Sequence, residues 1–283
     1  MSNMKSGKWS KEEHNYLREN WIKDGSVKVG KALNRNHRNV GCMANYLGLR
    51  SGWGDKPRFR RYAINGDIFK TWTMESAYLV GFILADGNIT ERAVGISSKD
   101  IELLEKAKKA FSSEHPIKKV HAKNLYRLRI GSKKIVSSLK SIGITENKSK
   151  TITLPIVPDA FFTDFLRGYI DGDGMIMYRP KRGFVVNITT GSPYILEDLS
   201  DSITRLFDVE RHSPSTQTGK KGKTISTWYR LTYCGASAAR ICKAIYHKCD
   251  YLFLSRKRQS YFDYRDRPRS LDLRHNGNAT KYK

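Results

Sequence analysis

The chain has 283 residues, with 52 Lys and Arg against 27 Asp and Glu, and a formal net charge of +25. Self-repulsion at this charge destabilises the compact state, and nucleic acid is the usual anionic partner because each neutralised phosphate releases counterions. No apolar run approaches the length of a membrane-spanning helix, and the basic residues are spread along the chain, so we expect no membrane partner.

The N-terminal residues, MSNMKSGKWSKEE, contain no apolar stretch that would serve as a secretion signal. The four cysteines show no CxxC spacing, which argues against a zinc site. These features predict a protein that stays inside the cell with reduced thiols.

Residues 1–50 are predicted to form three short helices. Ser10 and Glu13 match the capping-box pattern, in which each side chain bonds the other residue's backbone at a helix start. Gly25 breaks this first helix, a short second helix follows, and the third runs from about residue 37 to 47. The segment therefore reads as a small all-α domain.

The third helix of this domain carries Arg38 and Asn39, side-chain types that read DNA in helix-turn-helix proteins. The segment WSKEEHNYLREN…VGKALNRNHRNVGCMANYLGLR resembles Myb-like trihelical domains. The alternative is a three-helix packing module without a ligand. Given the charge of the whole chain we favour DNA binding and place both residues among the predicted DNA contacts.

Residues 51–74 are rich in glycine and basic side chains and lack a sustained hydrophobic period. This composition predicts a basic linker. It either lies along a DNA backbone or is a solvated connector, and the sequence favours neither strongly.

An internal repeat organises the rest of the chain. LVGFILADGNI (79–89) matches LRGYIDGDGMI (166–176), and YRLRIG (126–131) matches YRLTYCG (229–235). Between and after these segments, alternating stretches and amphipathic stretches recur in the same order. Each copy is predicted to read helix–strand–strand–helix–strand–strand–helix.

The repeat sets the predicted boundaries. The first copy covers 75–158, the second covers 159–262, and 263–283 is a basic tail. The second copy is longer, chiefly through the polar insertion at 213–227, which we interpret as a hairpin tip.

The repeated helices carry small residues four positions apart, Gly81 with Ala85 and Gly168 with Gly172. Residues at i and i+4 share one helix face, so each helix presents a groove without side chains. A mid-helix glycine costs up to about 1 kcal/mol relative to alanine, which calls for a packing reason. We expect the two helices to pack against each other along these grooves.

Asp86 and Asp173 follow the small residues directly, and Gly87 and Gly174 are predicted to end the helices in the left-handed conformation. If the helices pack side by side, the two carboxylates lie close together at the negative ends of two helix dipoles. Oxygen ligands of this kind suit Mg²⁺ or Mn²⁺. Simple polar caps are the alternative, but two matched copies behind a small-residue face argue against it.

LVGFILADG and LRGYIDGDG resemble the two signature motifs of LAGLIDADG homing endonucleases in their single-chain, two-repeat form, over about residues 75–262. The resemblance implies an α+β fold, a pseudo-twofold αββαββα repeat whose saddle-shaped antiparallel sheets lie in the major groove of DNA. It implies a monomer in the cytoplasm of a prokaryotic or phage-infected cell, or in an organelle.

The resemblance also implies site residues. The last acidic residue of each motif is the metal ligand, which carries over to Asp86 and Asp173, and we include the preceding Ala85 and Gly172 in the predicted metal site. The other acidic position of the motif is a leucine in the first copy and Asp171 in the second, and we do not assign that residue to metal.

Members of the family also carry a basic residue near the end of each repeat that faces the scissile phosphates. Lys148 or Lys150 is the candidate for the first copy and Lys257 for the second, although an ordinary solvated lysine is the alternative at each position. Arginine pairs with the major-groove edge of guanine, so the exposed faces of the strands are expected to read bases. The candidate base-reading residues are Arg127, Arg129, Arg230 and Thr232, and the hydroxyls expected to position water are those of Ser98 and Thr190.

These features predict a metal-dependent endonuclease that makes a double-strand break in a long asymmetric DNA site. One alternative is an RNA maturase that binds intron RNA and assists splicing. Another is a helix-turn-helix transcription regulator built on an inactive endonuclease scaffold, for which the loss of one aspartate would be expected.

Overall fold

The protein is described by a computed structural model covering residues 4–49, 62–120, 124–145, 152–221 and 224–268. The chain divides into two compact units, Met1–Arg61 and Tyr62–Lys283. Within the described ranges, no helix is long and apolar enough to cross a membrane.

The N-terminal unit contains α1 (Lys11–Ala32) and α2 (His37–Tyr46). Gly25, with φ at 66° and ψ at 178°, interrupts α1, so the segment has the three helical pieces that the sequence predicts. Ser10 and Glu13 form the expected capping box, in which the Glu13 amide donates to the Ser10 hydroxyl at 3.2 Å and the Ser10 amide donates to the Glu13 carboxylate at 2.9 Å.

An ion pair that the sequence does not reveal ties this unit together. Arg35 lies in the turn before α2 and is only 5% exposed. Its Nε donates to Glu13 Oε1 at 3.0 Å and its Nη2 to Glu13 Oε2 at 2.8 Å, while the guanidinium sits 4.5 Å from the Trp9 ring centroid. The apolar core beside it contains Leu17, Trp21, Val29, Val40 and Ala44.

The second unit contains two copies of one motif. The first copy consists of α3 (Met74–Asp86), β1 (Gly87–Thr90), β2 (Ala93–Ser98), α4 (Ile101–Ala110), β3 (Ile117–Val120), β4 (Leu125–Gly131) and α5 (Lys133–Ser141). The second consists of α6 (Asp159–Asp173), β5 (Gly174–Arg179), β6 (Gly183–Thr190), α7 (Pro193–Phe207), β7 (Ser215–Lys221), β8 (Thr224–Cys234) and α8 (Gly235–Tyr246), followed by α9 (Ser255–Arg265).

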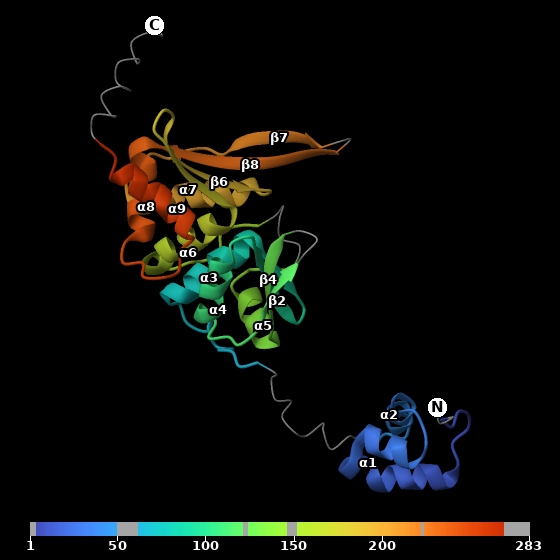
Figure 1. Cartoon of the computed structure of the whole chain (residues 1–283). Coiled ribbons are helices and arrows are strands. Elements are labelled where there is room, and N and C mark those ends of the chain that lie inside the picture. The colour runs from blue at the N-terminus through green and yellow to red at the C-terminus, as the bar shows by residue number, and fades with distance from the viewer. Residues whose placement is uncertain (1–3, 50–61, 121–123, 146–151, 222–223, 269–283) are drawn as a thin grey trace. The chain divides into compact units, whose positions relative to one another are not determined.

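The two sheets have the same topology. Their strand orders are β1-β2-β4-β3 and β5-β6-β8-β7, and every neighbouring pair is antiparallel. The predicted α+β fold with a pseudo-twofold αββαββα repeat is therefore confirmed. The predicted insertion in the second copy forms the long β7–β8 hairpin, which reaches beyond its neighbours in the sheet (Figure 1).

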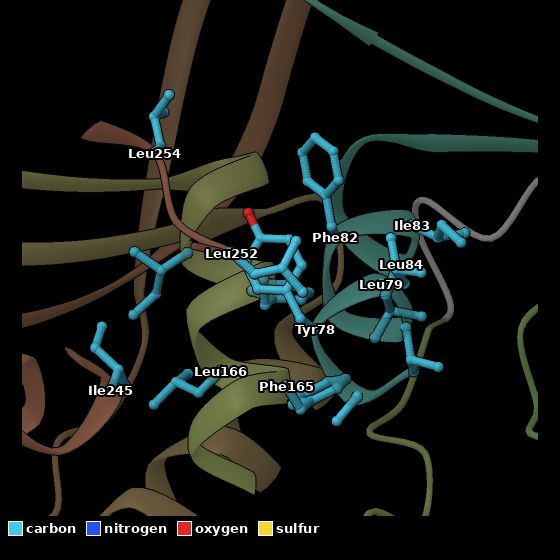
Figure 2. Close-up of a cluster of buried hydrophobic side chains, with 14 of the residues drawn as sticks. Tyr78, Leu79, Phe82, Ile83, Leu84, Phe165, Leu166, Ile245, Leu252 and Leu254 are labelled. Carbon is cyan, nitrogen blue, oxygen red and sulfur yellow. The ribbon is translucent and has the colours of Figure 1, made fainter. Parts of the chain in front are cut away.

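The core lies where α3 and α6 run side by side (Figure 1). Both helices are buried over most of their length because neighbouring elements cover them on several sides. Figure 2 shows side chains of both helices gathered with apolar residues of α8 and of the segment before α9, among them Tyr78, Phe82, Phe165, Leu166, Ile245 and Leu252. The helix pair is therefore held on both sides, which fixes the position of its ends.

Two predicted boundaries require correction. The linker assigned to 51–74 ends earlier, because Ile68 and Phe69 are buried and the Phe69 ring meets that of Phe111 edge-on at 6.0 Å. Residues 50–61 lie outside the described ranges. The tail assigned to 263–283 begins later, because α9 continues to Arg265 and the Tyr264 ring stacks on Phe184 at 4.4 Å. Apolar contacts with distant residues decide both boundaries.

Candidate active site

The predicted groove contact between α3 and α6 is present and reciprocal. A Cβ added to Gly81 would lie 2.0 Å from the carbonyl oxygen of Phe165, and a Cβ added to Gly168 would lie 2.0 Å from that of Tyr78. Real Cβ atoms do not approach backbone oxygens this closely, so only glycine fits at either position. The spacing of small residues was therefore a reliable signal of this interface.

The helix ends that carry the aspartates are also in contact. A Cβ added to Gly172 would lie 2.5 Å from the Ala85 methyl carbon and 3.5 Å from Asp86 Cβ. Asp86 is exposed and Asp173 is half-buried. The structure thus brings both predicted metal ligands, together with the residue before each, to the same end of the helix pair.

The glycines after the aspartates do not have the predicted left-handed conformation. Gly87 has φ at −81° and Gly174 has φ at −95°, and both lie in extended backbone that starts a strand. The reason for glycine is space, because an added Cβ would lie 2.5 Å from the Ile83 oxygen in one copy and 2.7 Å from the Ile170 oxygen in the other. The chain turns from helix to strand directly against the last helical turn.

A cavity lies beside each aspartate, and the two are related by the pseudo-twofold. The Asp86 pocket, about 480 Å³, is lined by Asp86, Ser97, Ser98, Lys99, Asp100, Leu125, Asp171, Gly172 and Arg256. The Asp173 pocket, about 180 Å³, is lined by Asp173, Thr190, Gly191, Leu84, Ala85, Gly87, Asn88, Ile89, Thr145 and Ile152. Each pocket combines one aspartate, the strand-end hydroxyl of the same copy and the helix end of the other copy.

Lys257 is placed differently from the sequence expectation. It is 2% exposed, and its ammonium donates to the carbonyl oxygens of Ile170 at 2.6 Å, Gly174 at 2.6 Å and Asp171 at 3.0 Å. Burial disfavours the charged form and lowers the pKa of Lys257 to about 8. The side chain caps the end of α6 and lines neither pocket, so its predicted contact with a phosphate stays a prediction.

Two cationic side chains, Lys99 and Arg256, do line the Asp86 pocket, and the sequence prediction named neither of them, choosing Lys257 beside Arg256. Membership of Arg256 in the basic run 256–258 was the available signal. Lys148 and Lys150 lie outside the described residues. Thr145 and Ile152, the described residues on either side of that segment, both line the Asp173 pocket.

Asp171 has a structural role that the sequence did not show. It is 3% exposed, and its Oδ2 accepts hydrogen bonds from the Tyr78 hydroxyl and the Leu254 amide, both at 2.9 Å. Burial raises the pKa of its carboxyl, with Lys257 opposing this shift. Its Oδ1 has no hydrogen-bond partner in the described part of the chain. The counterpart in the first copy is Leu84.

The predicted base-reading side chains lie on the outer faces of the sheets, opposite the helices. Arg127 and Arg129 are exposed on β4 and line a cavity of about 310 Å³ that also includes Asp86. Arg230 and Thr232 occupy the corresponding places on β8, where the Thr232 hydroxyl donates to Asn187 Oδ1 at 2.8 Å. The cationic side chains of the first sheet thus share a cavity with Asp86.

In the N-terminal unit, Arg38 and Asn39 are exposed in the first turn of α2, as a reading face requires. Tyr46 at the other end of this helix is 83% exposed. Their contact with DNA stays a prediction.

The described residues contain no group of three or more His, Cys, Asp or Glu side chains placed to hold a metal ion. The candidate ligands are therefore the two aspartates. Mg²⁺ commonly uses one or two carboxylates and keeps several waters for its other positions, so the pair of carboxylates fits this ion. Cavities beside the carboxylates leave room for those waters.

The model of the LAGLIDADG-like domain matches residues 73–143 and 161–246, more than half of the chain. The chain belongs to the LAGLIDADG family. The two matched segments coincide with the two structural copies, and each contains one aspartate at a helix end. The family match does not extend to the N-terminal unit.

Individual relatives are distant. The chain is 28% identical over 131 residues to a probable translation initiation factor IF-2 of Thermococcus kodakarensis, covering 44% of this chain and 11% of that protein. The chain thus spans about a tenth of the length of this curated relative.

Similar solved structures include I-DmoI in complex with DNA and Ca, with 14% identity, a TM-score of 0.44, and coverage of 74% of this chain and 99% of that chain. They also include the N-terminal LAGLIDADG domain of DUF199/WhiA, with 17% identity, a TM-score of 0.42, and coverage of 64% and 86%. Likeness at this level concerns the fold alone.

Proposed function

We propose that this LAGLIDADG protein is a metal-dependent DNA endonuclease that makes a double-strand break in a long asymmetric site. The observation that carries the proposal is the retention of both aspartates at adjoining helix ends, each beside its own cavity. A protein that only bound nucleic acid would have no need of a carboxylate pair there. Two anions at the negative ends of two helices are unfavourable unless a cation joins them.

The reaction is the hydrolysis of one phosphodiester in each strand. A water oxygen attacks phosphorus, one phosphorus–oxygen bond breaks, and the leaving oxygen takes up a proton. Asp86 and Asp173 would hold Mg²⁺ or Mn²⁺, which lowers the pKa of bound water and neutralises charge on the leaving oxygen. Ser98 and Thr190, one in each pocket, orient the attacking water by hydrogen bonding.

Duplex DNA is the substrate that matches the outer faces of the sheets. Arg127 and Arg129 form a cationic face that leads to Asp86, and arginine recognises both phosphates and guanine edges. At the position equivalent to Arg129, the second sheet has Thr232. Because the two faces differ in charge and in strand length, the two halves of the target differ in sequence. The exposed face of α2 in the N-terminal unit adds contacts with DNA through Arg38 and Asn39.

The test begins with the wild-type protein, Mg²⁺ and a library of randomised duplexes, from which the cut ends are mapped. Asp86→Asn and Asp173→Asn are then assayed on the recovered target, and both are expected to lose double-strand cleavage while retaining the fold. Asp159→Asn is the matched control, because Asp159 is an exposed residue at the other end of α6, paired with Arg205. Full Mg²⁺-dependent cleavage by either site variant would refute the mechanism.

A transcription regulator is the second candidate, favoured by the three helical pieces of the N-terminal unit. It predicts that the wild-type protein binds a specific duplex and leaves both strands intact in Mg²⁺ and in Mn²⁺. RNA maturase activity remains a third prediction, and splicing of the host intron in the presence and absence of the protein measures it.

A further inference from the structure

The second sheet has a core face and an outer face. Side chains that point into the core along β5, β6 and β8 are buried, and they include Ile176, Phe184, Val186, Ile188 and Leu231. Successive side chains of a strand point to opposite faces, so the residues between them lie on the outer face. This outer face is the surface that the proposed function assigns to DNA.

Apolar side chains gather on the outer face. Met175 and Met177 of β5 are opposite Asn187 and Val185 of β6, and Cys234 of β8 is opposite Val185 on its other side. Met175 is 39% exposed, Met177 and Val185 are half-buried, and Cys234 is exposed. Met175, Met177, Val185 and Cys234 thus form an apolar patch around Asn187. Exposed apolar patches commonly mark the contact with a partner.

The amide of Asn187 is held in one orientation within this patch. The Thr232 hydroxyl of the neighbouring strand donates to Asn187 Oδ1 at 2.8 Å. An asparagine amide recognises adenine by donating to N7 and accepting from the N6 amino group. Oδ1 has a second lone pair for that bond. Asn187 therefore favours an A·T pair on this part of the face.

The apolar patch favours the same base pair. Phosphates and most groups on the base edges form hydrogen bonds, and the apolar group that the major groove offers is the C5-methyl of thymine. Apolar side chains placed against other base edges would cover hydrogen-bonding groups without pairing them. Adenine at Asn187 and thymine at the patch are thus two independent signals for A·T pairs.

The packing of the sheet does not require these apolar residues. The first sheet has the same strand order, and its row equivalent to Met175 and Asn187 consists of Asn88, Gly95 and Arg129. Polar and cationic side chains therefore fit this place in the fold. The patch reflects the surface that this copy contacts.

We propose that the β5–β6 part of the second sheet reads a run of A·T pairs, with thymine methyl groups packed on the apolar patch and an adenine bound by Asn187. The inference names the sequence class of one half of the target, and it rests on duplex DNA being the substrate in the proposed function. Arg230 lies further along the same face, opposite Thr189, and a guanine contact there is compatible with the run.

The test starts with a selection of bound duplexes from a randomised library, using the full chain without divalent metal. One half of the recovered site is expected to contain the A·T run. Each thymine is then replaced in turn by deoxyuridine, which removes the methyl group and keeps the base pair. Replacement of a contacted thymine is expected to weaken binding about fourfold. The affected thymines should lie together in the run.

Met177→Ala tests whether the patch makes the contact. At least one uracil replacement should lose its effect on affinity in this variant, because the methyl group then has no side chain to pack on. Asn187→Ala should lower the preference for adenine at one position of the run by about tenfold. Met74→Ala is the matched control, since Met74 is a methionine at the start of α3 and is 51% exposed. It should keep the wild-type affinity and every uracil effect.

Three results overturn the inference: a selected site without an A·T run, uracil replacements that leave the affinity unchanged, or a Met177→Ala variant that keeps every uracil effect. If that variant also loses self-association in size-exclusion chromatography, a second copy of the chain covers the patch instead. Failure of the proposed function is a separate result. A selected duplex that shows the uracil effects but is not cut in Mg²⁺ or Mn²⁺ refutes the endonuclease and supports the base reading, whereas selection of no duplex refutes both.

Discussion

Replacement of Gly172 by alanine tests the helix-end contact on which the proposed site depends. The added methyl group would lie 2.5 Å from the Ala85 methyl carbon, whereas carbon atoms in contact lie about 3.5–4.0 Å apart. The two helix ends must therefore separate by about 1 Å or more. Asp86 and Asp173 directly follow these two residues and move with them.

The substitution has two opposing effects on the free energy of unfolding. Alanine gains up to about 1 kcal/mol in helix propensity over glycine, while overpacking a filled interface costs about 1–3 kcal/mol. The net loss of stability is thus small. The effect on catalysis is larger, because a displacement of about 1 Å between reacting groups costs about 100-fold in rate. Gly172→Ala is expected to remain folded and to lose most of its cleavage activity.

The assay is single-turnover cleavage of the target duplex, with urea unfolding of the same samples. The double variant Ala85→Gly with Gly172→Ala provides the control, because it moves the methyl group to the other helix and removes the overlap. It should recover most of the rate lost by the single variant. Wild-type cleavage by Gly172→Ala would refute the argument, and so would a double variant no faster than the single one.

Three further outcomes follow from named contacts. The pKa of Glu13 is held at about 2, chiefly by its hydrogen bonds with Arg35, against 4.5 for the free group. The N-terminal unit should therefore lose stability as the pH falls from 4.5 towards 2, measured by hydrogen exchange of α1, and Arg35→Ala should cost about 3 kcal/mol at neutral pH. Tyr78→Phe should cost about 1–3 kcal/mol in urea unfolding, since it leaves the buried Asp171 carboxylate with one hydrogen bond fewer. The β7 strand has seven residues against four in β3, which at about 3.3 Å per residue adds about 10 Å. A footprint of the bound target should extend about three base pairs further on that side.

Local sequence patterns predicted the fold correctly because the same order of patterns occurs in both copies. Period-2 and period-3.6 patterns placed the strands and helices of both copies, and the matching motifs showed that α3 and α6 are equivalent. Boundaries that depend on non-local packing were wrong, as at Phe69, which is buried against α4, and at Tyr264, which stacks on β6. The described parts of the linker and of the tail, residues 62–74 and 263–268, appeared polar in sequence, although the rings of Phe69 and Tyr264 pack on the fold.

The site residues show the same difference between what local patterns predict and what non-local contacts decide. Asp86 and Asp173 were assigned from the motif and its small-residue spacing, and the structure brings their helix ends together. The role of Asp171 depends on Tyr78, 93 positions earlier, so sequence neighbours gave no sign of it. The glycine after each aspartate was predicted to be left-handed, which was wrong, because its backbone is extended and glycine is needed there for lack of space.

The net charge by itself predicted an anionic partner, and the repeated motif by itself predicted a two-copy fold with paired aspartates. Both predictions depend on composition and on short-range periodicity, and both of these can be read directly from the amino-acid sequence. Only the tertiary structure decided which of two neighbouring basic residues lines an aspartate pocket. Arg256 and Lys257 differ by one position along the chain, but α9 turns one towards the Asp86 pocket and buries the other in the end of α6. The direction of a side chain at a helix start is set by what the helix packs against, and that contact is formed by residues far away in sequence.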